Sequence, residues 1–120
     1  MKASEIIQVD AKRLRVDPNQ ILQGIKQEIE SKNSVLLQKN DSLFLLTKIR
    51  PNVVGVSMFT ADANITMFRS IQEAIIEMKQ QGISTIYGDN ENSFLLDGLK
   101  QAGVQIEKSD LPDYAWKATI

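Results

Sequence analysis

The sequence contains no cysteine and no histidine. Without cysteine there is no disulfide framework, no thiolate nucleophile and no cysteine-rich zinc site. Without histidine there is no Ser-His-Asp triad, no histidine-ligated metal and no imidazole acid or base. We therefore expect no metal site. Any general acid or base has to be a carboxylate, a lysine, a tyrosine, a chain terminus or a relayed water.

An excess of charge of one sign is also lacking. The 14 basic and 15 acidic residues give a formal net charge of −1, which predicts no attraction to nucleic acid or to an anionic membrane. Apolar runs such as Leu43–Leu46 are strand-sized, too short for a signal peptide or a membrane span. These observations predict a cytoplasmic protein with neither a nucleic-acid nor a membrane partner.

The length and composition are those of one globular domain. A chain of 120 residues with 42% hydrophobic residues can bury a core without covalent cross-links. We therefore expect residues 1–120 to form a single domain.

The first half predicts two short extended segments, one helix and a hairpin. Ile6–Asp10 and Arg13–Val16 are expected to be extended. Asp17-Pro18 is typical of a helix start, and isoleucines and leucines at helical spacing carry that helix to Lys32. Two antiparallel strands are expected to follow around the turn at residues 39–41, over Ser34–Gln38 and Ser42–Ile49.

The second half predicts an alternation of strands and helices. Val53–Thr60 is nearly continuously apolar at its start, which indicates a central strand. Thr66 is expected to cap a helix over Met67–Gln81 that ends at Gly82. The remaining predicted elements are a strand at Ser84–Tyr87, a helix over residues 93–101 and strands at Val104–Glu107 and Tyr114–Thr119. This order predicts an α/β (α+β) fold with a single mixed sheet, flanking helices and one parallel strand pair.

From Val53 onward, this order resembles the core of the GNAT acetyltransferase superfamily. The matching residues are Glu77–Ile83 at the end of the long helix and Asn92–Val104 around the second helix. The family pattern there is Asn, two residues, Ala, two residues, Leu-Tyr, three residues, Gly-Phe, and Asn92 and Gly103 match it in register. The resemblance implies an acetyltransferase-like (GNAT) fold with a shortened N-terminal half, since one helix is predicted where the family commonly has two.

The resemblance also implies a ligand, acetyl-CoA or another acyl-CoA, and a small-molecule or peptide amine as acceptor. The implied contacts lie at the end of the Val53 strand and around the two helix starts: Met58, Phe59, Thr60, Thr66, Met67, Phe68, Arg69 and Asn92. The same residue types have a plain structural interpretation. The methionines and phenylalanines suit the core, Arg69 a solvated helix surface and Asn92 a helix cap.

Two features depart from the family pattern. The family binds pyrophosphate with a Gln/Arg-x-x-Gly-x-Gly/Ala loop, whereas Thr60–Arg69 contains no glycine and carries Asp62, a carboxylate that would repel phosphate. The family's tyrosine acid corresponds to Leu99, which cannot donate a proton. Tyr87 is the candidate replacement. Candidate bases are carboxylates or a relayed water, and the carboxylates are Asp62, Asp89, Glu91 and Glu107.

Three functions follow as alternatives. The first is a small acyl-CoA-dependent N-acyltransferase. The second is a non-catalytic binding or virion-associated structural module on the same fold, similar to short bacteriophage acetyltransferase-like proteins. The third is an accessory domain that forms a homodimer or pairs with a partner through its last strand or the Trp116 edge. The sequence predicts an acetyltransferase-like protein of the bacteriophage type and leaves its catalytic competence open.

Overall fold

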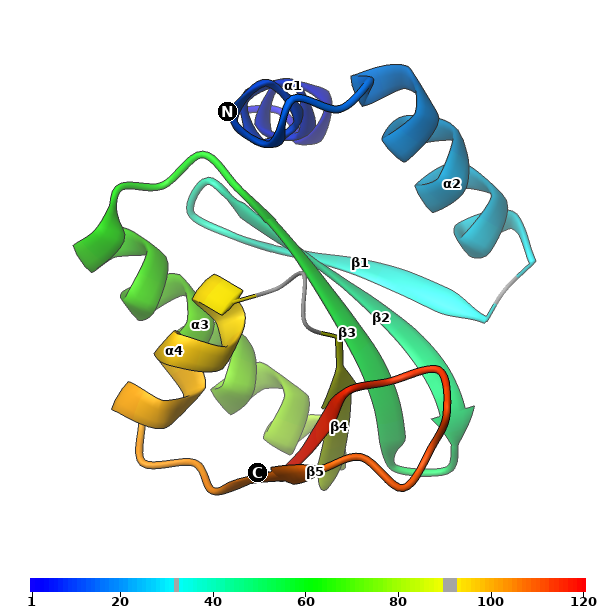
Figure 1. Cartoon of the computed structure of the whole chain (residues 1–120), viewed down its shortest axis with the longest axis vertical. Coiled ribbons are helices and arrows are strands. Elements are labelled where there is room, and N and C mark those ends of the chain that lie inside the picture. The colour runs from blue at the N-terminus through cyan, green and yellow to red at the C-terminus, as the bar shows by residue number, and fades with distance from the viewer. Residues whose placement is uncertain (32, 90–92) are drawn as a thin grey trace.

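A computed structural model describes residues 1–31, 33–89 and 93–120. Its core is a six-stranded mixed sheet with the strand order β1-β2-β3-β4-β6-β5, covered by helices on both faces (Figure 1). The strands are β1 (Ser34–Lys39), β2 (Ser42–Arg50), β3 (Val53–Thr60), β4 (Thr85–Gly88), β5 (Ile106–Lys108) and β6 (Trp116–Thr119). The helices are α1 (Ala3–Leu14), α2 (Pro18–Glu30), α3 (Asn64–Gln80) and α4 (Ser93–Gln101).

The predicted fold class is confirmed, including its single parallel strand pair. β3 and β4 run parallel and are connected through α3, whereas every other neighbouring pair in the sheet is antiparallel. β3 lies inside the sheet, as its apolar sequence predicted. The strand and helix bounds from Pro18 onward agree with the expected ranges to within a few residues.

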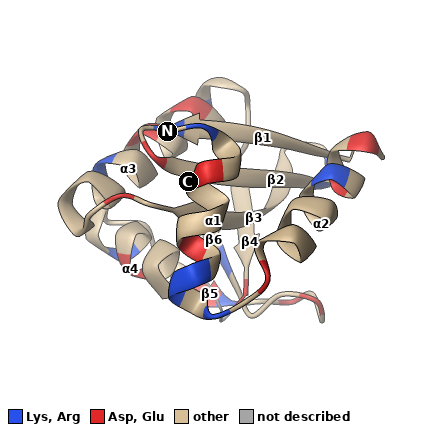
Figure 2. Ribbon diagram, turned by 90° about the horizontal axis from the view of Figure 1, so that it is seen from above, with Lys and Arg blue, Asp and Glu red and all other residues tan. Residues whose placement is uncertain are grey.

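Alternating residues of β2 face two separate hydrophobic clusters. Leu43 and Leu45 pack with isoleucines of α1 and α2, while Phe44 and Leu46 pack with α3 and α4. This alternation is the period of two expected for a strand covered on both faces. Figure 2 views the molecule from the side of α1 and shows basic and acidic residues interspersed rather than gathered on one face.

The prediction for the first sixteen residues was wrong. Ile6–Asp10 and the first two residues of Arg13–Val16 belong to α1, so the N-terminal half has two helices rather than one. The buried residues of α1 are Ile6, Ile7, Asp10 and Ala11, which is a helical spacing. β-branched isoleucines favoured an extended interpretation locally, and packing of this face against the sheet overrode that preference.

The start of α3 also differs from the prediction. Its N-cap is Ala63, not Thr66, and Thr66 lies inside the first turn. The connection from β3 is therefore only residues 61–63. The other end agrees with the prediction, because Gly82 follows the helix with φ 86°, a left-handed conformation that glycine adopts without strain.

Met58, Met67 and Trp116 are buried in the cluster beneath α3 and α4, as the core interpretation predicted. Trp116 is only 4% exposed, so its side chain packs within this cluster.

Candidate functional site

The parallel strands β3 and β4 separate partway along their length. They pair at Val53–Thr85, Val54–Ile86 and Gly55–Tyr87, after which β3 continues to Thr60 while β4 ends at Gly88. No strand in the described part of the chain pairs with this side of β3 beyond Gly55. We call residues 56–60 the open edge of β3.

Hydrogen bonds identify which backbone groups face away from β2. The N–H of Ala61 donates to the carbonyl of Asp41, in the turn directly before β2, over 2.8 Å. Because successive N–H groups alternate sides along a strand, the N–H of Thr60 points the opposite way, toward the open edge. It donates to Oδ1 of Asp10 on α1 over 3.1 Å.

Asp10 is a buried carboxylate that the sequence analysis missed. It is 2% exposed, and its Oδ1 also accepts a bond of 2.6 Å from Nη2 of Arg13. Its Oδ2 accepts no hydrogen bond from the described residues. A helical assignment of residues 3–14 would have predicted its burial, because it places Asp10 on the same face as Ile6 and Ile7. Buried carboxylates are rare without a function or a partner.

A cavity of about 410 Å³ lies beside the open edge, between it and the α1–α2 connection. Among the described residues that line it, three are carboxylates, Asp10, Asp17 and Asp89, and none is a lysine or an arginine. The other lining residues are Leu14, Val16, Gln20, Ile21, Ser57, Met58 and Phe59. This acidic cavity suits a small ligand that carries positive charge.

The predicted acid Tyr87 lies close to this region but does not line the acidic cavity. It is 1% exposed, and its hydroxyl donates to Oδ1 of Asp110 over 2.7 Å. This hydrogen bond is the main reason that the pKa of Asp110 lies below its ordinary value. Leu99, at the family's tyrosine position, is fully buried.

A second tyrosine, Tyr114, lies where the strands part and was also missed. Its ring packs directly against Gly55, the last residue of β3 that pairs with β4, and its centroid is 5.6 Å from that of Tyr87. Its hydroxyl makes no hydrogen bond to another described residue. Burial, followed by the charge of Asp113, raises its pKa, so the phenol is protonated at neutral pH.

The connection between β3 and α3 is held by Asp62. Its Oδ2 accepts bonds from the hydroxyls of Ser42 and Ser70 over 2.6 and 2.9 Å, and its Oδ1 accepts the N–H of Asp41 over 3.2 Å. Asp62 therefore fixes this connection to the β1–β2 turn. It does not line the acidic cavity, where a base would be needed.

The predicted cofactor-binding residues fall into three groups. Met58 and Phe59 line the acidic cavity, and Thr60 donates its N–H to Asp10 at the open edge. Met67 is buried and Phe68 partly buried, so both contribute to packing. Thr66 and the exposed Arg69 lie in the first two turns of α3, whose N-cap residue makes no side-chain cap bond. Asn92, like the candidate base Glu91, lies outside the described residues.

Solved structures of GNAT acetyltransferases share this fold. An acetyltransferase of the GNAT family from Staphylococcus aureus Mu50 superposes with a TM-score of 0.61 at 15% identity, covering 95% of this chain and 87% of that one. A Bacillus subtilis acetyltransferase in complex with CoA gives 0.56 at 14%, covering 99% and 91%. The Campylobacter jejuni N-acetyltransferase PseH in complex with acetyl coenzyme A gives 0.53 at 14%, covering 100% and 92%. The chain therefore has the GNAT acetyltransferase fold.

Comparison with protein-family models gives no match, and neither does comparison with curated proteins. At these low identities the structural likeness establishes the fold, and the activity has to be argued from the site. Over residues 1–31, 33–89 and 93–120, no helix has the length and apolar character needed to cross a membrane. In the same ranges, no three acidic side chains are grouped as a metal site would require.

Proposed function

We propose that this chain is an acetyltransferase-like protein that binds acetyl-CoA or another acyl-CoA along the open edge of β3 and a small amine in the acidic cavity. The observation that carries the proposal is the separation of β3 from β4 beyond Gly55 and Tyr87, directly beside that cavity. Three of the fold's relatives are named as complexes with CoA or acetyl-CoA. An acyl-CoA would supply an activated acyl thioester.

The open edge suits the amide-containing arm of such a ligand. An unpaired strand edge offers alternating N–H and C=O groups, which is how extended ligands are recognised in β-augmentation. On the open side of β3 these are the N–H groups of Met58 and Thr60, by alternation from Ala61. Asp10 accepts the N–H of Thr60, so a ligand that uses this N–H has to displace the carboxylate.

The β3–α3 connection is less suited to bind the pyrophosphate of an acyl-CoA than the glycine-containing loop of the family pattern. The connection at residues 61–63 has no glycine and carries Asp62, whose carboxylate is tied to Ser42 and Ser70. The remaining donors for phosphate are the backbone N–H groups in the first turn of α3 and the guanidinium of Arg69. We therefore expect weak phosphate recognition, supplied by the helix dipole and one cation.

The acidic cavity favours an amine as the second ligand. Asp10 presents an Oδ2 that accepts no hydrogen bond from the described residues, and Asp17 and Asp89 add negative charge to the lining. These carboxylates would hold an ammonium group near the open edge. Rate enhancement would come mainly from positioning the two ligands together.

Proton donation to a leaving thiolate is the weakest part of the site. Leu99 cannot donate, and the hydroxyl of Tyr87 is bonded to Asp110. Tyr114, a protonated phenol against Gly55, is the better placed of the two tyrosines. We propose that acyl transfer at this site is slow and that it depends on Tyr114 more than on Tyr87.

The second candidate function is a non-catalytic binding module of the bacteriophage type, including a virion-associated one or a homodimer. It is favoured by the bond from Thr60 to Asp10, which already satisfies an N–H of the open edge, and by leucine at the tyrosine position. Virion or packaging genes beside the coding sequence would support this origin.

Thermal unfolding with added ligand tests the first proposal. A ligand at about 100 times its Kd adds about 2.7 kcal/mol of stability, which shifts Tm by several degrees. We expect a shift with millimolar acetyl-CoA and a smaller one with pantetheine. Asn64→Asp adds one negative charge at the first position of α3 and should reduce the acetyl-CoA shift alone. Gln72→Glu makes the same change in charge further along α3 and is the matched control.

The absence of any shift at millimolar acetyl-CoA would reject ligand binding at this site. Where a shift is found, mass spectrometry of the protein mixed with acetyl-CoA and a diamine separates the two functions. Acetylated amine that falls with Tyr114→Phe and not with Tyr87→Phe would support the enzyme. Binding without product would support the binding module.

A further inference from the structure

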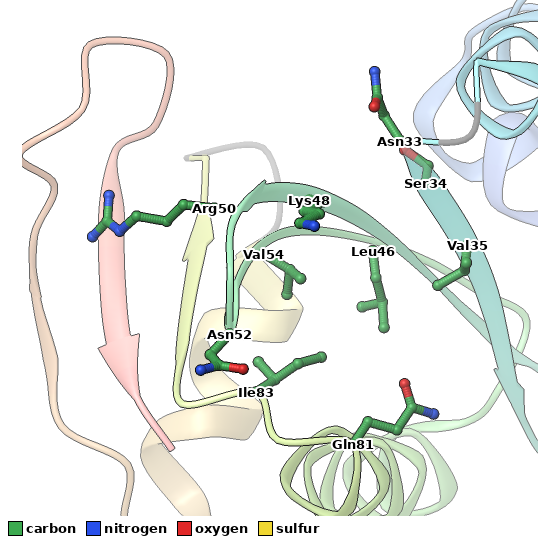
Figure 3. Close-up of a pocket in the computed structure, with 10 residues that line it drawn as sticks. All are labelled: Asn33, Ser34, Val35, Leu46, Lys48, Arg50, Asn52, Val54, Gln81 and Ile83. Carbon is green, nitrogen blue, oxygen red and sulfur yellow. The ribbon is translucent and has the colours of Figure 1, made fainter.

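A second pocket lies on the opposite face of the sheet from the acidic cavity. It has a volume of about 260 Å³ and is formed by β1, the end of β2, the start of β3 and the segment that follows α3 (Figure 3). Its lining residues are Asn33, Ser34, Val35, Leu46, Lys48, Arg50, Asn52, Val54, Gln81 and Ile83. We call it the basic pocket, because the described residues that line it include two cationic side chains and no carboxylate.

The floor of the basic pocket is apolar. Leu46 and Val54 belong to the cluster beneath α3, and Ile83 packs against that cluster. α3 ends at Gln80, so it leaves this corner of the sheet uncovered, and Val35 at its margin is 59% exposed. Figure 3 shows Leu46, Val54 and Ile83 grouped at the centre of the pocket.

Most of the polar side chains that line this pocket have no partner among the described residues, whereas the hydroxyl of Ser34 is bonded to Thr47 and Glu28. The side chains of Asn33, Lys48, Arg50, Asn52 and Gln81 make no hydrogen bond or ion pair with any residue in the described ranges. Elsewhere, the lysines Lys39 and Lys117 have carboxylate partners. In Figure 3 the carboxamide oxygen of Asn52 faces Ile83 and its nitrogen points away from the floor, and the guanidinium of Arg50 also extends away from it.

Three of the last four carbonyls of α3 are engaged in hydrogen bonds. Those of Glu77, Met78 and Lys79 accept the N–H groups of Gln81, Ile83 and Gly82 over 3.0 Å. The C-terminal negative charge of a helix resides on unsatisfied carbonyls. These bonds therefore reduce the negative charge that the end of α3 presents to the basic pocket.

We propose that the basic pocket binds a small organic carboxylate with an apolar chain. The chain would cover Leu46, Val54 and Ile83. The carboxylate would accept a hydrogen bond from Lys48 and, once their carboxamides rotate, from Nδ2 of Asn52 and Nε2 of Gln81. A carboxylate fits better than a free phosphate, because the floor is apolar and only two cationic side chains of the described residues line the pocket, of which Arg50 extends away from the floor. The proposal does not depend on acyl-CoA binding at the open edge.

Titration of the ¹⁵N-labelled chain with sodium hexanoate, followed by amide NMR shifts, tests this proposal. Hexylammonium chloride and 1-hexanol at the same ionic strength are the matched probes. We expect saturable shifts at Val54, Ile83 and the side-chain amides of Asn52 and Gln81 with hexanoate. We expect binding at least about tenfold weaker with the other two probes, the ratio that corresponds to one charge-assisted hydrogen bond.

Variants separate charge recognition from a general apolar surface. Lys48→Gln should weaken hexanoate binding by about tenfold, whereas Lys100→Gln, an exposed lysine on α4, should not change it. Val35 is an exposed residue at the rim of the pocket, so the fold should tolerate Val35→Asp. The new carboxylate would repel hexanoate, and we expect this variant to abolish binding. Equal affinity for hexanol, no effect of Lys48→Gln and Val35→Asp, or shifts confined to Ser57–Phe59 would each overturn the proposal.

Discussion

The carboxylate of Asp10 accepts the backbone N–H of Thr60 across fifty positions of the sequence, over 3.1 Å. This hydrogen bond joins α1 to the last residue of β3, at the point where β3 has no neighbouring strand on that side. In a complete sheet that N–H would donate to a strand carbonyl. A side chain from α1 supplies the missing acceptor, so the first helix completes the backbone hydrogen bonding of the open edge.

We expect Asp10→Ala to destabilise the fold by about 1–3 kcal/mol, because it leaves the buried N–H of Thr60 without an acceptor. Asp10→Asn keeps an oxygen acceptor and should cost less. Urea unfolding, with the free energy extrapolated to water, measures both changes. Val9→Ala, at the neighbouring and exposed position of α1, is the control. Equal stability of Asp10→Ala and Val9→Ala would show that water replaces the carboxylate at no cost.

The sequence predicted the second half of the fold well because its signals there are local. The apolar run at Val53, the glycines at positions 82 and 103, and helical spacing in between each specify one element. Element order then predicted the parallel pair. Thr66 was misassigned as a cap because Ala63, the true N-cap, makes no side-chain bond that sequence could indicate.

The N-terminal helix and much of the candidate site depend on contacts distant in sequence. α1 is helical because its buried face meets β2 and β3, which a short window does not reveal. Asp10 and Tyr114 become part of the site only when α1 and the β5–β6 connection fold against β3. The separation of β3 from β4, which defines the site, is a property of the sheet and has no sequence motif here.

The bond between Tyr87 and Asp110 predicts a change in acid titration. Because this bond lowers the pKa of Asp110, it contributes stability above the ordinary pKa of a carboxyl, and that contribution is lost as pH falls through the lowered value. Tyr87→Phe should therefore move the pKa of Asp110 upward, toward its ordinary value. Carboxyl ¹³C NMR over an acid titration measures the shift directly.

Tyr114→Phe is the matched control for that titration. Tyr114 is not among the groups that shift the pKa of Asp110, so its loss should leave the titration of that carboxyl unchanged. If Tyr87→Phe also left it unchanged, the hydroxyl of Tyr87 would not be bonded to Asp110 in solution and would be free for another role.

Asp62 is expected to stabilise the β3–α3 connection rather than to act as a base. Asp62→Ala removes the acceptor shared by Ser42 and Ser70 and should cost about 1–3 kcal/mol of stability. The measurement is the free energy of unfolding beside that of Glu73→Ala, a carboxylate on α3 with one long hydrogen bond of 3.4 Å from Asn40. A cost for Asp62→Ala no larger than that of Glu73→Ala would argue against this role.

Three glycine-to-alanine changes separate close packing from backbone freedom. A Cβ at Gly88 would overlap the ring of Trp116, which is rigid and buried, so Gly88→Ala should destabilise by about 2–4 kcal/mol. At Gly98 the overlap is with the end of the Ile71 side chain, which can shift, and alanine gains about 1 kcal/mol of helix propensity. Gly98→Ala should therefore cost less than Gly88→Ala.

Gly24→Ala on α2 is the control without overlap. A Cβ at this position meets no atom within 4 Å, so the change should stabilise the fold by about 1 kcal/mol. Thermal unfolding of the three variants gives the order, and a Gly88→Ala variant as stable as Gly24→Ala would mean that Trp116 does not pack against β4.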